Sequence, residues 1–467
     1  MGGDKIENSG ILWYIFTWKD RMFDKKSGAL ILLLPVFVIA CQDLFNDKQF
    51  GPAELAFELI DNGTAYRVRK GTVWTGIVII PATYNGKPVT EIGSTSDSSD
   101  NGAFYNTSIT SVYIPASVTS IGSNAFIYCR SLGAVTFAAD SQLATIDRNV
   151  FYYCSKLTSI TIPASVTTIS TGAFYGCSSL TSITIPAGVT SIGGGSPLFY
   201  GGAFSYCTSL IGITIPASVT SIGEYAFSGC SSLESVTFAA GQLQSIDGSA
   251  FIHCTSLTSI TIPASVTSIG GSVFVGCSNL ESVTFAAGSQ LQSIGRYMFV
   301  NCTSLTSITV DASNQNYTTE NGILYDKYKT KLIATPTGIS GNVIIPASVT
   351  SVGEGAFFSC SNLESVTFAA GSLLQSIGSG AFSDCVGLTS IAIPAGVTSI
   401  GWGAFQDSTS LTNIIIPANV TFIDSYAFSR WTPAQVIMIM GKTQAQAEAT
   451  LGTDWRAGCN AAIIYQQ

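Results

Sequence analysis

The stretch Leu157–Cys177, LTSITIPASVTTISTGAFYGC, is the unit from which most of the chain is built. Later copies of this unit repeat its apolar positions, and each copy opens on a leucine. These leucines lie 23–25 residues apart, except from Leu180 to Leu210 (30 residues) and from Leu305 to Leu363 (58 residues). A fixed period in the twenties is typical of a solenoid, in which each coil buries its apolar face against the next. The opening leucines are Leu132, Leu157, Leu180, Leu210, Leu233, Leu257, Leu280, Leu305, Leu363, Leu388 and Leu411.

Each copy of the unit predicts one strand followed by a compact turn. Ile160 and Ile162 alternate with polar residues, so they face the core while the residues between them face outward. Pro163 has no N–H group and ends the strand. The segment 173–177 fits one helical or 3-10 turn, with Phe174 and Cys177 filling the far side of the core.

Three motifs recur with variation from about Ile109 to Phe428: L-x-x-I-x-I-P, V-T-S-I-G and A-F-x-x-C. They resemble the BspA-like leucine-rich repeats of bacterial surface proteins, and the A-F-x-x-C element separates this type from other leucine-rich repeats. The chain departs from ordinary leucine-rich repeats at the ninth position, where Asn is usual and Ser165 or Gly188 stands here. The resemblance implies a surface or secreted protein without a catalytic site, and several such relatives are adhesins. We therefore predict a right-handed leucine-rich-repeat superhelix with one parallel β-sheet, short helical or 3-10 turns on the opposite side, and a β-rich N-terminal cap.

Ten cysteines lie three residues after the repeat phenylalanine. One slot used ten times predicts a ladder of buried, mostly reduced thiols, each packed against the phenylalanine of its own coil. Paired disulfides are the alternative, although parallel side chains of adjacent coils rarely meet disulfide geometry. Ser408 fills the same slot with no evident compensation. The ten are Cys129, Cys154, Cys177, Cys207, Cys230, Cys254, Cys277, Cys302, Cys360 and Cys385.

The N-terminal residues 1–41 predict an export signal. Gly28–Ala40 is a short apolar run that follows two lysines and ends at Cys41. The sequence Val38–Cys41 resembles a bacterial lipobox, which predicts that Cys41 carries lipid; an ordinary signal with an incidental cysteine is the alternative. Met22 would begin a signal of ordinary length, so we expect it to be the true start.

The remaining chain divides into four expected parts. We predict a tether at 42–56, an N-terminal cap and first coil at 57–108, repeats at 109–430, and a C-terminal cap at 431–467. Insertions interrupt the repeats near 193–202 and 310–343. The second insertion predicts two strands around a charged turn, and it is interpreted either as a variant coil or as a ligand contact.

The composition argues against most kinds of chemistry. A net charge of −8 argues against a nucleic-acid partner. Phosphate-binding loops of the G-x-x-x-x-G-K-[ST] type are absent, and the single histidine, His253, stands in a variable slot. We predict no catalytic residue, no metal and no cofactor. A hydrolase in the caps would need a polar constellation in 42–100 or 431–467, where none is evident.

The outward strand positions form a two-column row of hydroxyl groups. Three interpretations stay open: soluble filler residues, a binding face for extended protein or glycan, and a water-ordering face of the ice-binding kind. Aromatic residues in the two insertions are further candidate contacts. The candidate ligand-binding residues are Thr161, Thr184, Thr214, Thr237, Thr261 and Thr284 on the strands, and Phe199, Tyr200, Tyr325 and Tyr328 in the insertions.

These observations predict a non-enzymatic, adhesin-like protein. We expect it to be lipid-anchored at the outer membrane or cell surface, and to bind extracellular protein or glycan of host matrix or other cells. The alternative is a passive surface-layer or spacer protein without a specific ligand.

Overall fold

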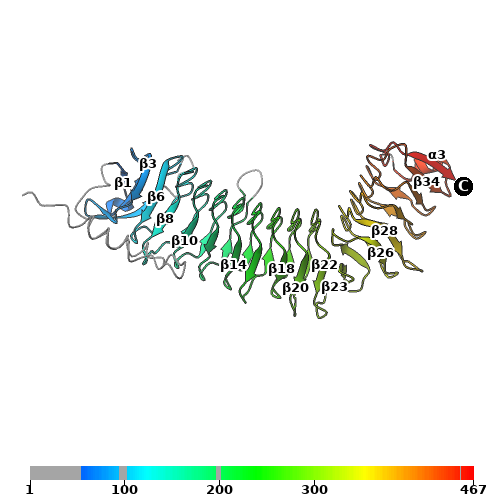
Figure 1. Cartoon of the computed structure of the whole chain (residues 1–467), viewed down its shortest axis with the longest axis horizontal. Helices are drawn as coiled ribbons and strands as arrows, with labels where there is room; N and C mark the ends of the chain where they lie inside the picture. Colours follow the sequence, from blue (N-terminus) through cyan, green and yellow to red (C-terminus); the bar gives the residue numbers. More distant parts are fainter. Residues whose placement is uncertain (1–53, 94–101, 196–200, 453) are drawn as a thin grey trace, which may run out of the picture. The chain divides into compact units, whose positions relative to one another are not determined.

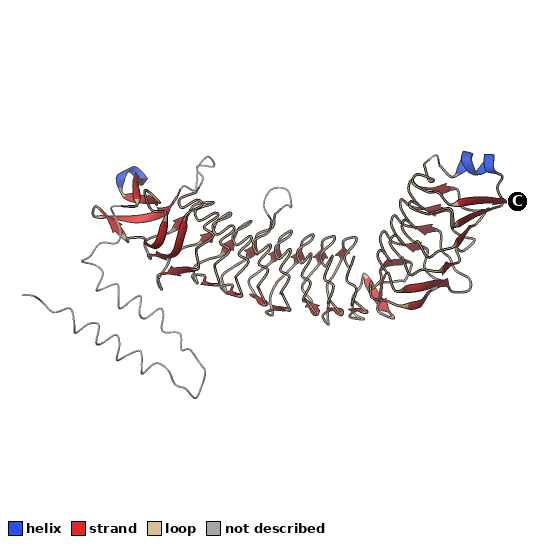
Figure 2. Ribbon diagram, turned by 45° about the horizontal axis from the view of Figure 1, so that its top comes forward, coloured by secondary structure: helices blue, strands red, loops and turns tan. Residues whose placement is uncertain are grey.

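The structure, a computed structural model, describes residues 54–93, 102–195, 201–452 and 454–467. Over these residues the chain winds as a solenoid, which confirms the predicted fold class (Figure 1). Each regular coil contains a longer strand, a two-residue strand and a turn, and Figure 2 shows the strands following one another as short rungs. Equivalent residues of neighbouring coils therefore lie beside one another along the whole repeat region.

The first column consists of the longer strands, which pair in parallel. Ser282 of one strand lies opposite Ser307 of the next, and Val283 lies opposite Ile308. The column is divided into short sheets of two or three strands. Its strands are β6 (Ser108–Ile114), β8 (Ala134–Phe137), β10 (Ser159–Thr161), β12 (Ser182–Thr184), β14 (Gly212–Ile215), β16 (Ser235–Phe238), β18 (Ser259–Ile262), β20 (Ser282–Phe285), β22 (Ser307–Val310), β26 (Gly341–Ile345), β28 (Leu363–Phe368), β30 (Ser390–Ile391) and β32 (Asn413–Ile416).

A second column of parallel strands was not predicted, because we expected one sheet. Thr168 and Ile169 lie opposite Ser191 and Ile192 of the next coil, and the isoleucines point inward. The residues after the proline turn are extended again, so their backbone groups pair between coils as well. These strands are β7 (Ser120–Ile121), β9 (Thr145–Ile146), β11 (Thr168–Ile169), β13 (Ser191–Ile192), β15 (Ser221–Ile222), β17 (Ser245–Ile246), β19 (Ser268–Ile269), β21 (Ser293–Ile294), β27 (Ser351–Val352), β29 (Ser376–Ile377), β31 (Ser399–Ile400) and β33 (Phe422–Ile423).

The A-F-x-x-C segments form a third hydrogen-bonded column. Within one coil, Cys177 N–H donates to Phe174 O at 3.1 Å, as in a 3-10 turn. Gly172 and Gly176 have φ of 65° and 69°, and these left-handed residues stop the turn from continuing as a helix. Between coils, Phe174 N–H donates to Ala203 O at 2.8 Å. The expected helical turns are thus single turns, and each is hydrogen-bonded to the turn of the next coil.

Stacked phenylalanines fill the core behind these turns. The ring of Phe204 lies 5.4 Å from that of Phe174 and 5.3 Å from that of Phe227, with nearly parallel planes. All three side chains are fully buried. Each ring therefore depends for its contacts on the coils before and after it.

The ten ladder cysteines are buried and unpaired, as predicted. Their thiols, however, contact the preceding coil: Cys207 Sγ donates to Phe174 O at 3.2 Å. Ser408 is compensated after all, because its Oγ donates to Phe382 O at 2.6 Å. In the next coil Trp431 Nε1 donates to Phe405 O at 2.8 Å. The slot therefore selects a hydrogen-bond donor rather than a thiol.

The insertion after β22 adds three strands, β23 (Tyr317–Glu320), β24 (Ile323–Asp326) and β25 (Lys331–Ala334). The expected pair of strands around the charged turn is β24 and β25, which pair antiparallel, and β25 then joins the second column through β27. Leu324 packs in the core that precedes the insertion, whereas Tyr325 packs in the core that follows it. The insertion thus connects two hydrophobic cores.

At the N-terminal end, β2 and β5 continue the second column and β3 begins the first. At the C-terminal end, β34 and β35 extend the first column, and the short helix α3 has a capping box made by Thr443 and Gln446. The end elements are β1 (Ala56–Ile60), η1 (Asp61–Gly63), β2 (Ala65–Arg69), β3 (Thr75–Ile79), β4 (Thr83–Tyr84), β5 (Lys87–Ile92), β34 (Val436–Met440), α3 (Gln444–Thr450) and β35 (Ala462–Gln466).

Candidate functional site

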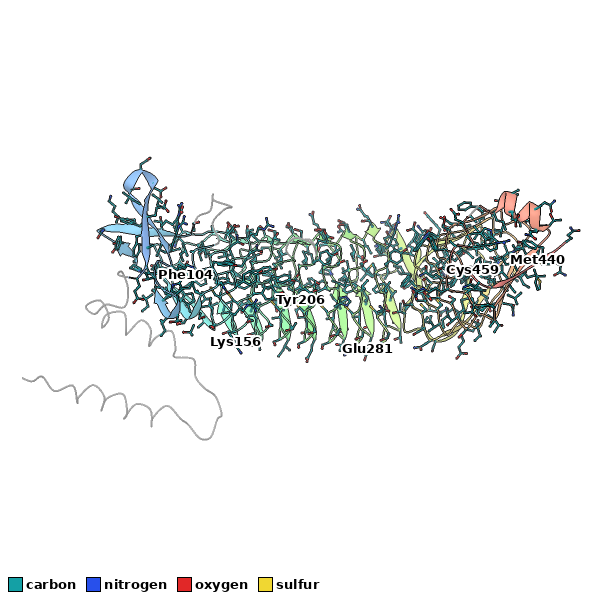
Figure 3. All side chains as sticks on the ribbon, turned by 90° about the horizontal axis from the view of Figure 1, so that it is seen from above. Phe104, Lys156, Tyr206, Glu281, Met440 and Cys459 are labelled. Carbon is teal, nitrogen blue, oxygen red and sulfur yellow. The ribbon has the colours of Figure 1, made fainter. Side chains whose placement is uncertain are left out.

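The outward side of the longer strands carries the expected hydroxyl columns, which we call the strand face. Between β14 and β16, Thr214 lies opposite Thr237, and Thr261 of β18 lies opposite Thr284 of β20. Thr161, Thr184, Thr214, Thr237 and Thr261 are exposed, whereas Thr284 is half-buried. Figure 3 shows Lys156 and Glu281 on the edge of the ribbon that carries these strands.

The strand face changes its chemistry beyond the second insertion. Asn342 Oδ1 accepts hydrogen bonds from Ser365 and Thr367 of the next strand, at 2.8 and 3.1 Å. Beside it, the Ile344 side chain is exposed. Ile415, Met438 and Ile464 then occupy one outward row on β32, β34 and β35. The hydroxyl columns therefore continue onto β28 through Ser365 and Thr367, and they give way to apolar residues only on β32, β34 and β35.

Only one of the two aromatic side chains predicted as contacts in the second insertion is exposed at the surface. Tyr325 is 1% exposed, so it is a core residue and the prediction of a surface contact is wrong for it. Tyr328 is 81% exposed. The charges of the turn are engaged within the insertion: Lys329 Nζ lies 2.7 Å from Glu320 Oε2, and the Asp326 carboxylate accepts from the N–H of Lys331. These contacts support the interpretation as a variant coil.

Six tyrosines gather on the turn column of the first coils, and we call them the tyrosine cluster: Tyr105, Tyr128, Tyr152, Tyr153, Tyr175 and Tyr206. Tyr152 and Tyr175 stack with centroids 4.5 Å apart and planes 9° from parallel. Tyr128 stacks on Tyr153 at 5.7 Å, and Tyr153 meets Tyr152 edge-on at 5.0 Å. Five of the six side chains are half-buried, and Tyr206, labelled in Figure 3, is 49% exposed.

The surroundings of the cluster fix its rings. A Cβ at Gly176 would lie 2.8 Å from the ring of Tyr153, and one at Gly229 would lie 2.9 Å from that of Tyr206, so these glycines make room for the rings. Burial, and then the neighbouring phenols, raise the pKa of Tyr175 well above its ordinary value. The guanidinium of Arg130 lies 5.7 Å from the Tyr128 ring centroid and 5.8 Å from that of Tyr153.

Our sequence reasoning missed this cluster, although a signal was present. The two variable slots of A-F-x-x-C hold tyrosine repeatedly between residues 105 and 206, and hold Ser, Gly, Val or Asp in most later coils. The motif is defined by its repeated Ala, Phe and Cys positions, and the tyrosines stand in the two positions that vary. Reading the variable slots as columns would have found the cluster.

The other predicted positions give no chemical site. His253 has φ of 59° and its ring packs over Gly276, which gives it a structural place in the turn column. Across the described ranges, no group of three His, Cys, Asp or Glu side chains could hold a metal ion. In the same part of the chain, no helix has the length and apolar character needed to cross a membrane. Phe199, Tyr200 and Cys41 lie outside the described residues.

The fold and the repeat positions define a leucine-rich-repeat solenoid of the surface-protein type. The family model described as the BspA type leucine rich repeat region matches residues 98–201, 197–321 and 339–449. The chain therefore belongs to the BspA-type leucine-rich-repeat family. Comparison with curated proteins gave no significant match.

Two solved structures are similar over most of the chain. A leucine rich cell surface protein from Faecalibacterium prausnitzii is 31% identical, with 89% of this chain and 94% of that chain covered and a TM-score of 0.49. A leucine-rich repeat protein from Bacteroides ovatus is 24% identical, with 89% and 100% covered and a TM-score of 0.53. Family membership assigns the chain to leucine-rich-repeat surface proteins, with a general role in protein interaction.

Proposed function

We propose that this protein is an exported, non-enzymatic surface protein that binds an extracellular protein or glycan through its strand face, in the manner of an adhesin. The observation that carries the proposal is the register of the exposed threonines, which repeats from β10 to β18. Stacked strands lie about 4.8 Å apart, so an extended ligand would meet a regular series of identical groups. Membership of a surface-protein family supports the same function.

A preformed face of this kind suits binding without catalysis. Each hydroxyl contact contributes about 0.5–1.5 kcal/mol net, so affinity must come from several coils together. The backbone beneath the threonines is already ordered by pairing between coils, which lowers the entropy lost on binding. A passive spacer remains the alternative function and predicts no saturable binding at all.

Lysines on the strand face should weaken binding strongly. In the variant Thr214→Lys/Thr261→Lys the two new side chains stand on alternate coils, so they do not repel each other directly. They would hold the ligand away from the face, and we expect retention of the full chain on immobilised matrix proteins or on intact bacterial cells to fall about tenfold or more.

The matched control is Thr190→Lys/Thr398→Lys, which adds the same charge at exposed threonines beside the second column. Equal loss of retention in the two variants would contradict the strand-face assignment. Loss of binding in Tyr328→Ser alone would instead assign binding to the second insertion.

We further propose that residues 1–41 direct export and that Cys41 carries a lipid anchor at the outer membrane or cell surface. The motivation is the lipobox-like Val38–Cys41 after a short apolar run. Cys41→Ala should move the protein from the membrane fraction to the soluble fraction, as measured by immunoblotting of fractionated cells. Cys459→Ala is the control and should leave the distribution unchanged; an unchanged distribution for Cys41→Ala would contradict the anchor.

A further inference from the structure

We propose that β35 is a docking edge for a second copy of this chain, and that the β35 strands of the two copies pair antiparallel about a two-fold axis. The proposed adhesive function uses the outward side of the longer strands, whereas this contact uses the edge of one strand. The inference therefore goes beyond the proposed function and can fail independently of it.

The edge of β35 is open. This strand pairs with β34 and, among the described residues, with no other strand. Ala462 N–H donates to Gln435 O at 3.0 Å, which shows that the backbone groups of Ala462 point toward β34. Because backbone groups alternate in direction along a strand, those of Ile463 and Tyr465 point away from β34. Their N–H and C=O groups are the ones that an added strand would meet.

This edge lacks the features that usually prevent pairing. Exposed edge strands commonly carry a charge, a proline or a bulge, and the sequence of β35, AIIYQ, contains neither a charge nor a proline. Its register with β34 runs without a shift. The first strand of the same column differs, because β3 has a register shift between Gly76 and Ile77. The β35 edge is therefore the better docking edge of the column.

The sequence of β35 is complementary to itself. Antiparallel pairing centred on Ile464 places Ile463 opposite the partner's Tyr465, and Tyr465 opposite the partner's Ile463. Because these residues point their backbone groups to the edge, each such pair exchanges both of its backbone hydrogen bonds. The side chains of Ile463 and Tyr465 are half-buried and pack against the core on the inner side of the sheet. Pairing would bury them further against the same residues of the second copy.

The outward side of the strand is apolar as well. Ile464 is 46% exposed and continues the outward row of Ile415 and Met438. In the paired strands Ile464 lies opposite the partner's Ile464, so the two apolar rows meet end to end. One pairing thus covers apolar side chains on both sides of the sheet, which favours a second copy over a polar peptide.

The distribution of charge permits this contact. The whole chain carries a net charge of −8, but residues 432–467 contain Lys442 and Arg456 against Glu448 and Asp454. This end is therefore neutral, and the net negative charge belongs to the residues before it. Because the acidic parts of two copies repel each other, contact at the neutral ends is favoured over contact along the sides.

The pairing would also extend the binding surface. Opposite residues of paired strands point to the same side of a sheet, so the outward strand faces of both copies lie on one side at the joint. A ligand that spans the joint would then be bound with avidity. This consequence rests on the proposed function, whereas the dimer itself does not.

The test measures the mass of the full chain by sedimentation equilibrium over a range of concentrations. We expect a reversible monomer–dimer equilibrium in the micromolar range, as is usual for a small interface. In Ile464→Lys two like charges would meet at the two-fold axis, so dimerisation should weaken about tenfold or more. Ile464→Glu should have the same effect. An equimolar mixture of the two variants should restore the dimer, because opposite charges then meet.

Ile415→Lys is the matched control, because Ile415 is 48% exposed in the same outward row and lies two strands from the edge. It should leave the dimer and the thermal melt unchanged, and Ile464→Lys should leave the melt unchanged as well. Thr214→Lys/Thr261→Lys should weaken ligand retention without affecting the dimer, which separates this proposal from the proposed function.

Three results would overturn the proposal. The first is a native chain that stays monomeric at every concentration. The second is equal loss of the dimer in Ile415→Lys and Ile464→Lys, or a mixture of the two Ile464 variants that does not dimerise. The third is loss of self-association in Ile77→Lys, which would indicate that β3 of one copy pairs with the end of the next in a head-to-tail chain.

Discussion

Replacing Phe227 by alanine is expected to destabilise the protein by about 3–5 kcal/mol, the usual cost of truncating a fully buried phenylalanine. Its ring contacts those of Phe204 and Phe251, each with centroids 5.3 Å away. Because a coil contacts only its neighbours, the cavity would also uncouple the coils on its two sides. Equilibrium unfolding in urea should therefore show a lower midpoint and a broader transition.

Phe422→Ala is the matched control, because the same atoms are removed from a side chain that is 48% exposed. We expect this change to cost about 0.5 kcal/mol or less. Equal destabilisation by the two substitutions would mean that the stacked phenylalanines do not couple the coils.

Alkaline pH is expected to unfold the protein through its buried thiols. Burial raises the pKa of Cys230 and Cys277 from 9.0 to about 12. Because the folded state holds these protons more tightly, the thiols contribute their full stability below pH 9, and this stability is lost as the pH rises toward 12. Each pKa unit corresponds to about 1.4 kcal/mol per thiol, and all ten ladder thiols act in the same direction.

Circular dichroism and thiolate absorbance, followed together between pH 8 and pH 12, should therefore change in one cooperative step. In the variant Cys230→Ser/Cys277→Ser the step should move to higher pH. The serine hydroxyl still donates the hydrogen bond that the thiol donated, and it does not lose its proton in this pH range. Thiolate absorbance that rises while the folded signal persists would contradict the buried ladder.

The core could be predicted closely from the repeat because each core residue type recurs at a fixed position of every coil. A residue such as Phe174 or Ile160 recurs at a fixed position, and burial is the only environment that every copy shares. The second strand column was not predicted, since two extended residues such as Ser191 and Ile192 are too short to produce an alternating pattern. The compensation at Ser408 depends on a carbonyl of the previous coil, which no local pattern reveals.

The candidate sites were harder to predict for the same reason. Tyr325 was predicted as a contact because it is an aromatic residue in an insertion, but β24 lies between two cores, so Ile323, Leu324 and Tyr325 are all buried. In the tyrosine cluster the stacking partners, such as Tyr128 and Tyr153, come from different coils. Their contact depends on how consecutive turns are superposed, which the period suggests but does not specify.

The central claim is that the folded solenoid binds an extracellular macromolecule by its surface alone. The most direct measurement compares retention of the native full chain with that of the same chain unfolded in urea and diluted just before loading. The comparison uses immobilised extracellular-matrix proteins and intact bacterial cells. The account predicts saturable retention of the native chain on at least one of these supports, and its loss on unfolding. No saturable retention on any support would contradict the account and leave the passive spacer as the better description.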